Sequence, residues 1–308
     1  MSGPADRRDG FAVIDKEPGC TSHDVVARAR RLLDIRKIGH AGTLDPDATG
    51  VLILGVGRAT RLLRYVTALA KTYEATVVFG AATDTCDAAG NIVDTWDMSD
   101  LAEERARAAA AAFVGEIQQI PPMVSAVKVG GRRLHELARE GRTVAREPRT
   151  VTVQSFDVTG FGAGDRPRAT VTVTCSSGTY VRTLAADWGA ALGGGAHLAA
   201  LRRTAVGSFT EAEARPLEHL EVLAPAAGVR DYASLTVSEA AARDVAQGRR
   251  LPASGLHGAG PWAVLDGSGS LLAMCERRGE DLQPVVVLAA GLRPPPADAG
   301  GGGGSPDR

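Results

Sequence analysis

The chain has 308 residues, of which 44% are hydrophobic, so it can bury the core of one large or two ordinary domains. Its 35 lysine and arginine residues nearly balance its 36 aspartate and glutamate residues, and the net charge of -1 excludes a uniformly basic surface. Any nucleic acid must therefore bind at a local basic patch.

The cysteines and the N-terminal sequence indicate the cellular compartment in which the protein is expected. The four cysteines lie far apart without a CxxC pair, which argues against a zinc site and a disulfide framework: Cys20, Cys86, Cys175 and Cys275. The polar N-terminus lacks an apolar signal segment, and no apolar run reaches the roughly 18 residues of a membrane span. We therefore expect a soluble protein of the reducing cytoplasm with no membrane partner.

The N-terminal part of the chain predicts strands and one helix. Residues 11–16 form a short apolar run that indicates a buried strand. Thr21 can cap a helix over residues 23–37, which carries arginines on one face and apolar residues on the other. Residues 51–56 are apolar without alternation, as in a strand or helix start buried on both sides. Residues 73–80 alternate and are rich in β-branched residues, which predicts a strand.

The middle of the chain continues with strands and two helices. Residues 92–96 resume a strand composition after a turn, and residues 101–114 are helical by propensity. Two alternating segments, residues 150–161 and 168–175, predict strands, and a helix follows over residues 179–193. Because strands and helices do not interleave evenly, we expect a mixed-sheet α/β (α+β) domain and not a doubly wound parallel sheet.

Composition divides the chain into two domains with disordered ends. Residues 11–228 form the main α/β domain, and residues 128–149 form a basic insertion in it. Residues 229–291 contain a helical patch and short strands with glycine-rich turns, which indicates a small β-rich module. Residues 1–10 and the Pro/Gly tail of residues 292–308 have little to bury and are expected to be disordered.

The stretch KIGHAGTLDPDATGVLILGVGRATRL places Asp45 in a loop of small residues that leads directly into the core. An ordinary turn explains Asp-Pro and Ala-Thr-Gly equally well on this window alone. Two features favour a functional carboxylate. Gly39 and Gly42 allow a backbone to approach closely, and Pro46 restrains the chain beside Asp45. A held aspartate can act as a nucleophile, a base or a metal ligand.

Metal and nucleotide sites are not indicated. GVGRAT lacks the GK[ST] ending of a phosphate-binding loop. The aspartates of ATDTCDAAG, at Asp84 and Asp87, miss the spacing of a calcium loop, so we interpret this segment as a turn.

Two segments are locally basic and can bind RNA phosphates. Residues 27–37 carry five positive charges against one negative, and residues 128–149 carry seven against three. A solvated helix face is the alternative explanation for such runs. The second segment also contains glycine breaks, which suits a clamp loop that positions RNA without reading its sequence.

Six stretches resemble the bacterial tRNA pseudouridine synthase B family and follow the family's order over most of residues 11–220. They are IDKEPGCTSHDVV, GHAGTLDPDATGVLILGVGRAT, KTYEATVVFGAATDTCDAAG, SAVKVGGRRLHELAREGR, CSSGTYVRTLAADWGAALG and HLAALRRTAVGSF. The resemblance implies a pseudouridine synthase catalytic domain with a C-terminal PUA-like RNA-binding domain. It also implies isomerisation of a uridine in the tRNA T-loop, at position 55, without a metal or other cofactor.

The resemblance assigns roles to individual residues. Asp45 is expected to be the catalytic carboxylate, Tyr73 to stack beneath the target base, and Arg182 to pair with Asp45. An arginine partner is expected to lower the pKa of Asp45 and keep it ionised. The remaining family positions are expected to line the pocket or to bind RNA: His40, Tyr180, Leu201, Lys16, Lys128, Arg132, Arg133 and Arg142.

Each of these residues also has a structural explanation. Tyr73 can be a cross-strand packing residue, and Arg182 can pair with Asp187 instead of Asp45. His40 can belong to a turn, and Leu201 is ordinary core on any pattern argument. The chain departs from the family at DKEPG, where DKP-x-G is usual, and at two positions that usually hold tyrosine, Val124 and His135. None of these departures replaces a proposed catalytic group.

The expected function is therefore a stand-alone, monomeric isomerase that binds the T-arm and acceptor end of tRNA. Two alternatives stay open. The first is an RNA-binding helper that opens and recloses the T-arm during tRNA folding. The second is a guide-RNA-dependent synthase of the archaeal and eukaryotic type, which requires partner proteins.

Overall fold

The computed structural model describes residues 9–123, 125, 128–129, 131–133, 140 and 144–288. Contacts divide the chain into two compact units, with the boundary between Leu223 and Ala224. The sequence placed this boundary after residue 228. Each unit is described by itself below.

The first unit is built on a mixed sheet that has nine strands in the described part of the chain. Its main path runs β1-β3-β12-β4-β11-β10-β7, while β2 pairs with β3 and β13 pairs with β12. Only β12 and β3 are parallel among these pairs, which agrees with the expected mixed sheet. The strands are β1 Gly10–Lys16, β2 Ile38–Ala41, β3 Thr49–Val56, β4 Lys71–Phe79, β7 Gly115–Gln119, β10 Arg149–Gly162, β11 Arg168–Cys175, β12 Ala196–Val206 and β13 Phe209–Thr210.

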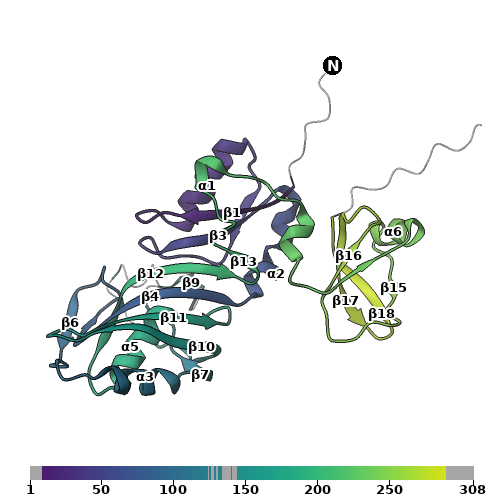
Figure 1. Cartoon of the computed structure of the whole chain (residues 1–308). Helices are drawn as coiled ribbons and strands as arrows, with labels where there is room; N and C mark the ends of the chain where they lie inside the picture. The colour runs from purple at the N-terminus through teal and green to yellow at the C-terminus, as the bar shows by residue number, and fades with distance from the viewer. Residues whose placement is uncertain are drawn as a thin grey trace, which may run out of the picture. The chain divides into compact units, whose positions relative to one another are not determined.

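Helices α3 and α5 cover one face of this sheet, side by side (Figure 1). Trp188 of α5 is fully buried against the sheet. Its ring packs edge-on against Phe79 of β4, with 4.8 Å between ring centroids, and against Phe156 of β10, with 5.0 Å between centroids. This packing fixes the start of α5, where Arg182 lies. The α-helices in the described part of this unit are α1 Ser22–Leu33, α2 Leu63–Ala68, α3 Glu103–Ala111 and α5 Val181–Ala191.

Local signals explain where α1 begins and ends. Thr21 is the N-cap, and its hydroxyl and the Asp24 carboxylate satisfy each other's backbone amides in a capping box. The helix ends at Asp34, which adopts a left-handed conformation with φ of 50°. The helix is therefore shorter than the predicted segment, which ran to residue 37.

Part of the segment predicted to be disordered belongs to the sheet. β1 begins at Gly10, inside the segment predicted to be disordered. Asp9 binds Arg58 through both carboxylate oxygens, one to the backbone amide at 2.6 Å and one to the guanidinium at 2.5 Å. These contacts account for the order of residues that composition alone assigned to a loose terminus.

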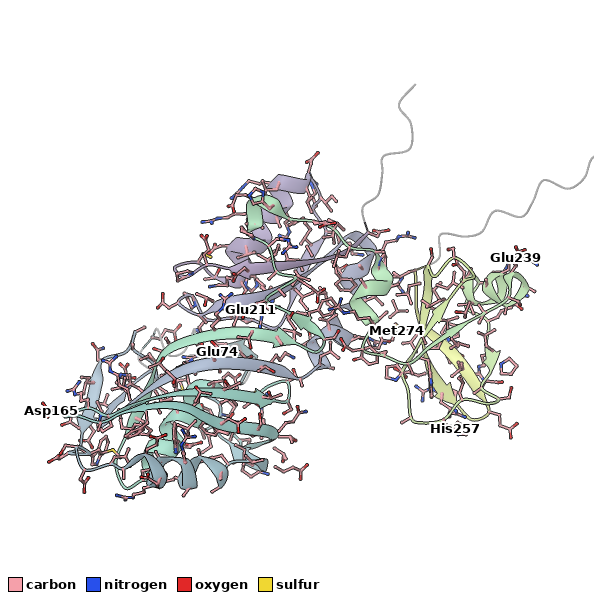
Figure 2. All side chains as sticks on the ribbon, in the orientation of Figure 1. Glu74, Asp165, Glu211, Glu239, His257 and Met274 are labelled. Atoms are coloured by element: carbon pink, nitrogen blue, oxygen red, sulfur yellow. The ribbon has the colours of Figure 1, made fainter. Side chains whose placement is uncertain are left out.

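The pairing of β4 with β12 sorts side chains onto two faces. Tyr73 lies opposite Arg203, and Glu74 lies opposite Arg202. Because successive residues of a strand point to opposite faces, Tyr73 and Arg203 share one face, and Glu74 and Arg202 share the other. Figure 2 labels Glu74 on β4. Arg202 there binds Asp15 bidentately at 3.0 Å.

Two short hairpins extend from the first unit. β5 (Ala81–Thr83) pairs with β6 (Ile92–Thr95), and β8 (Lys128–Val129) pairs with β9 (Arg132–Arg133), both antiparallel. The β5–β6 hairpin carries the ATDTCDAAG turn.

The second unit is β-rich, as expected for a PUA-like module. Its five-stranded sheet has the order β14-β16-β17-β18-β15, and α6 packs on its core. Trp262 and Met274 are buried in it, and Figure 2 labels Met274. The elements are β14 Ser234–Thr236, α6 Glu239–Ala246, β15 Leu251–Pro252, β16 Trp262–Leu265, β17 Leu271–Arg278 and β18 Asp281–Val287.

Gly50 is a position where the sheet tolerates no side chain. Its φ is +97°, and an added Cβ would lie 2.2 Å from the Arg203 carbonyl oxygen on β12. We expect Gly50→Ala to lower the free energy of unfolding by about 3 kcal/mol, combining backbone strain with a clash that backbone atoms cannot relieve. Urea unfolding measures the change. Gly193→Ala is the control, because its φ is +84° but its Cβ meets nothing within 4 Å. A cost for Gly50→Ala no larger than the control's would contradict the clash.

Candidate active site

The loop between β2 and β3 holds Asp45 in a fixed position. The neighbouring residue, Leu44, is buried, and its backbone is bound at both ends by the hydroxyl of Ser22 on α1. The Leu44 amide donates to Ser22 Oγ at 2.9 Å, and Ser22 Oγ donates to the Leu44 carbonyl at 3.2 Å. The loop is thus anchored to a helix one residue before the candidate catalytic carboxylate.

Lys16 anchors the other side of the same loop. Its side chain is only 1% exposed, and its ammonium donates to the carbonyls of Pro46 at 2.8 Å and Ala48 at 2.7 Å. A third bond reaches the carbonyl of Glu17 at 3.0 Å. The ammonium therefore anchors the loop that carries Asp45. RNA contact by Lys16 stays a prediction.

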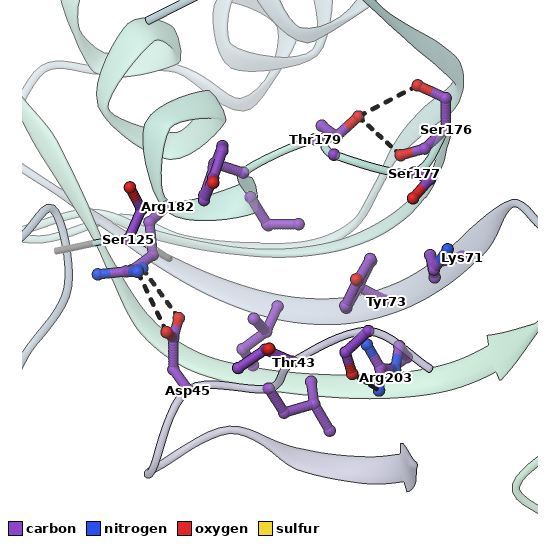
Figure 3. A pocket seen from close by; sticks show the side chains of 16 residues that line it. Thr43, Asp45, Lys71, Tyr73, Ser125, Ser176, Ser177, Thr179, Arg182 and Arg203 are labelled. Atoms are coloured by element: carbon purple, nitrogen blue, oxygen red, sulfur yellow. Dashed lines mark hydrogen bonds and ion pairs between the residues drawn. The ribbon is translucent and has the colours of Figure 1, made fainter. Parts of the chain in front are cut away.

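Arg182 forms a bidentate ion pair with Asp45 (Figure 3). Its Nε lies 2.9 Å from Asp45 Oδ2, and its Nη2 donates to Oδ1 at 3.1 Å. The guanidinium is buried, while the Asp45 side chain is 40% exposed and lines a pocket. Such bidentate geometry fixes the plane of the carboxylate as well as its position. The pairing expected from the sequence is present.

Asp87 is a second carboxylate on the same guanidinium. Arg182 Nη1 donates to Asp87 Oδ2 at 3.1 Å and to the Thr85 carbonyl at 3.2 Å. Asp87 also accepts bonds from the Thr85 hydroxyl at 2.6 Å and the Ala89 amide at 3.1 Å. The segment is a turn, as interpreted from the sequence. Its contact with the active-site arginine was missed, because 95 residues separate Asp87 from Arg182 and no local pattern reveals the pair.

The pKa of Asp45 is raised, contrary to the expectation from its arginine partner. Burial is the largest cause, and the charge of Asp87 adds to it, while Arg182 opposes the rise. Two carboxylates share one guanidinium, so the stabilisation each receives is smaller than that in an isolated pair. Asp45 is therefore a stronger base than a solvated aspartate.

Tyr73 and Arg182 meet Asp45 at one pocket of about 260 Å³. Tyr73 is 8% exposed, and Figure 3 shows it beside the loop that carries Asp45. Burial raises the pKa of Tyr73, and Arg203 offsets part of that rise through its charge and a hydrogen bond. The hydroxyl is therefore a neutral phenol at neutral pH.

Leu201 and Tyr180 line the same pocket, and His40 does not. The Tyr180 backbone is held by the buried Gln119, whose side-chain amide accepts from the Tyr180 amide at 2.9 Å and donates to its carbonyl at 3.1 Å. His40 packs edge-on against His23, with 5.2 Å between ring centroids. Burial, followed by His23 and Arg203, lowers the pKa of His40 to about 4, so its ring is uncharged at neutral pH.

The expected RNA-clamp residues lie in a segment of which the structure describes only part. Lys128 and Arg133 belong to β8 and β9, but only their backbone is described. Arg132 is exposed and binds Glu140 through two guanidinium nitrogens, at 2.5 and 3.1 Å. Arg142 lies outside the described residues. RNA contact by these four residues stays a prediction.

Within the described ranges, no group of three or more His, Cys, Asp or Glu side chains is placed to hold a metal ion. In the same part of the chain, no helix is long and apolar enough to cross a membrane.

Solved structures with the same fold include a chain of a Cbf5–Nop10–Gar1 complex, with a TM-score of 0.71 and 25% identity over 92% of this chain and 86% of that one. A chain of an H/ACA ribonucleoprotein bound to a substrate RNA with 2′-deoxyuridine has a TM-score of 0.70 at 23% identity, with the same coverage. The model described as TruB family pseudouridylate synthase (N terminal domain) matches residues 30–181. Fold and site therefore define a pseudouridine synthase, an isomerase.

Two C-terminal models of the same family follow without a gap. The tRNA pseudouridylate synthase B C-terminal domain matches residues 182–231, and the tRNA pseudouridine synthase II C-terminal model matches residues 232–289. The curated tRNA pseudouridine synthase B of Thermobifida fusca is 47% identical over 91% of this chain and 99% of its own. That of Symbiobacterium thermophilum is 50% identical over 78% and 82%. The chain belongs to the TruB family of pseudouridylate synthases.

Proposed function

We propose that this protein isomerises the uridine at position 55, in the T-loop of tRNA, to pseudouridine. The observation that carries the proposal is the pocket in which Asp45, Tyr73 and Arg182 meet, on a fold shared with relatives named tRNA pseudouridine synthase B. The reaction requires cleavage of the bond between N1 and C1′, rotation of the base, and a new bond between C5 and C1′.

Asp45 supplies the carboxylate that attacks the nucleotide and holds it while the base turns over. Arg182 keeps both of its oxygens in place, and the raised pKa makes the carboxylate more nucleophilic than a solvated one. Tyr73 stacks beneath the base, and its neutral hydroxyl relays the proton that leaves carbon, giving up its own proton as it takes up the new one. None of these steps uses a metal or a redox cofactor.

The target uridine must leave its stack to reach this pocket. Leu201 and Tyr180 would hold the flipped base, since both line the pocket with Tyr73. The basic segments at residues 27–37 and 128–149 would bind phosphates of the T-arm, and the β-rich unit would bind the acceptor end. The protein would act as a cytoplasmic monomer.

Tritium release tests the proposal. T-arm transcript and full tRNA transcript, each labelled at uridine C5, are incubated with purified protein without cofactor or partner. Label should be released in an amount equal to one uridine per RNA, and replacing the uridine at position 55 by cytidine should abolish release. Release that survives the cytidine replacement would place the target elsewhere in tRNA.

The same assay separates the alternatives. A tRNA-folding helper would bind and refold the transcript without releasing label. A guide-dependent synthase would release label only after guide RNA and partner proteins are added. Either result would overturn the proposed stand-alone activity.

A further inference from the structure

The buried Lys, Arg, Asp and Glu side chains in the described part of the chain are all cations: Lys16, Lys71, Arg182 and Arg203. Arg182 has two carboxylate partners, and Lys16 holds the Asp45 loop. Lys71 and Arg203 differ, because neither has a carboxylate partner among the described residues. Buried charges are normally paired, so two adjacent unpaired cations need a functional explanation.

Lys71 begins β4 and is 5% exposed. Its ammonium donates to the carbonyls of Thr67 at 2.5 Å and Leu69 at 2.6 Å. Burial first, and then the charge of Arg203, lowers the pKa of Lys71 to about 8. Its cross-strand neighbour Cys175 offers no counter-charge, because burial raises the pKa of that thiol to about 11.

Arg203 reaches the same place from β12. Its side chain is 1% exposed, its Nε donates to the Val51 carbonyl at 2.7 Å, and its Nη2 donates to the Gly42 carbonyl at 3.1 Å. A Cβ on Gly42 would lie 3.5 Å from Arg203 Nη1 and 3.7 Å from Lys71 Cε. Both cations therefore lie against the start of the loop that carries Asp45.

The two cations line the pocket beyond Tyr73. Lys71 and Arg203 belong to the same pocket lining as Asp45, and Figure 3 shows Tyr73 between the Asp45–Arg182 pair and Lys71. A uridine whose ribose C1′ faces Asp45 and whose base lies on Tyr73 points the base toward these cations. The base, and not the ribose, is thus the part of the substrate that meets them.

We propose that Lys71 and Arg203 stabilise the negative charge on the uracil base after its bond to ribose breaks, an inference that rests on the proposed isomerase function. When the bond between N1 and C1′ breaks, its electron pair stays on the base and spreads onto O2 and O4. C1′ takes up a carboxylate oxygen of Asp45. In the second half, C5 attacks C1′, the carboxylate leaves, C5 loses its proton and N1 gains one, so the net change is an isomerisation. Fixed cations beside developing negative charge accelerate such a cleavage.

Lys71→Met tests the proposal in single-turnover reactions with saturating enzyme and C5-tritiated tRNA transcript. We expect the rate constant to fall about 10²-fold or more while the dissociation constant of tRNA changes less than about threefold. Lys71→Arg retains a charge and should recover most of the rate. Arg166→Met is the charge control: Arg166 is exposed in the turn beside Asp165 (Figure 2), between β10 and β11, and Lys71 pairs with the opposite end of β11.

A better leaving group distinguishes charge stabilisation from packing. 5-Fluorouracil is a stronger acid than uracil, so its anion needs less help from the protein. The loss caused by Lys71→Met should therefore be several-fold smaller for consumption of 5-fluorouridine in the transcript, measured by nuclease digestion and mass spectrometry. Equal losses for the two bases would indicate that Lys71 only supports the packing of the pocket, and would overturn the proposal.

The pH dependence of the single-turnover rate constant gives a further test. It compares the wild type with Lys71→Arg and therefore does not depend on whether Lys71→Met folds. Lys71 is charged below about pH 8, so the wild-type rate constant should fall above that pH and the Lys71→Arg rate should not. Among the groups that face Lys71, burial raises the pKa values of Tyr73 and Cys175, so neither loses a proton in this pH range. The Arg203 guanidinium is the same in both enzymes. Ionisation of the uracil base affects the wild type and Lys71→Arg equally, so it cannot cause a difference between their pH profiles.

Two results would overturn the proposal while leaving the isomerase function standing. Wild type and Lys71→Met could turn over alike, or Lys71→Met could lose tRNA affinity at an unchanged saturated rate, which would assign Lys71 to a backbone phosphate. Failure of the proposed function looks different, because the wild type itself would then release no label.

Discussion

Asp45→Asn should bind T-arm RNA as the wild type does and release no tritium from C5. The amide keeps the size of the carboxylate and can still accept a bond from Arg182, but it cannot act as a nucleophile, so we expect a rate loss of about 10⁴-fold or more. Binding and release are measured on the same labelled transcript. Asp47→Asn is the matched control, since Asp47 is exposed on the same loop and does not line the pocket. Comparable losses in both variants would indicate a damaged loop.

The same variant should not lose stability. The pKa of Asp45 is raised in the folded protein, so the neutral form is favoured there and the ionised form costs free energy at neutral pH. Below the ordinary pKa of 3.8 the carboxyl is neutral in both states and the cost vanishes. The wild type should therefore lose stability relative to Asp45→Asn as the pH rises through the folded-state pKa. Urea midpoints over this range give the sign directly.

Local signals predicted the helices and strands that depend on nearby residues. The capping box at Thr21 and the alternation of β4, β10 and β11 are complete within a few residues, and the structure has all of these elements. β12 was not predicted as a strand, although it pairs with both β3 and β4. Its sequence, AHLAALRRTAV, does not alternate, because bulges between Leu198 and Ala200 and between Arg203 and Ala205 shift its register.

At the site, too, contacts between residues distant in the sequence could not be predicted from local signals. The Asp45–Arg182 pair spans 137 residues and came from the family resemblance, since no spacing rule connects the two positions. Arg203 and Asp87 were missed for the same reason. Arg203 could have been suspected from its register opposite Tyr73, but only once β12 was known to be a strand. Lys16 was expected to line the pocket or bind RNA, and only the folded structure reveals that it is buried against the carbonyls of the Asp45 loop.

Arg182→Met should be the most damaging change at the site for the fold. It leaves the carboxylates of Asp45 and Asp87 facing one another without the guanidinium that both now bind. Breaking a buried ion pair from one side costs about 3–5 kcal/mol, and we expect the lower end because Asp45 is 40% exposed. Urea unfolding measures the loss, which should shrink as the pH falls, because protonation of Asp45, whose pKa is raised, removes its repulsion with Asp87.

A second substitution separates repulsion from catalysis. Asp87→Asn in the Arg182→Met background removes one of the opposed charges, so the double variant should recover much of the lost stability. It should recover no activity, since Asp45 still lacks the two bonds that fix its oxygens. Recovery of tritium release would show that Arg182 serves only to neutralise charge. Its absence, with stability restored, would show that the orientation of the Asp45 carboxylate is what the arginine supplies to the reaction.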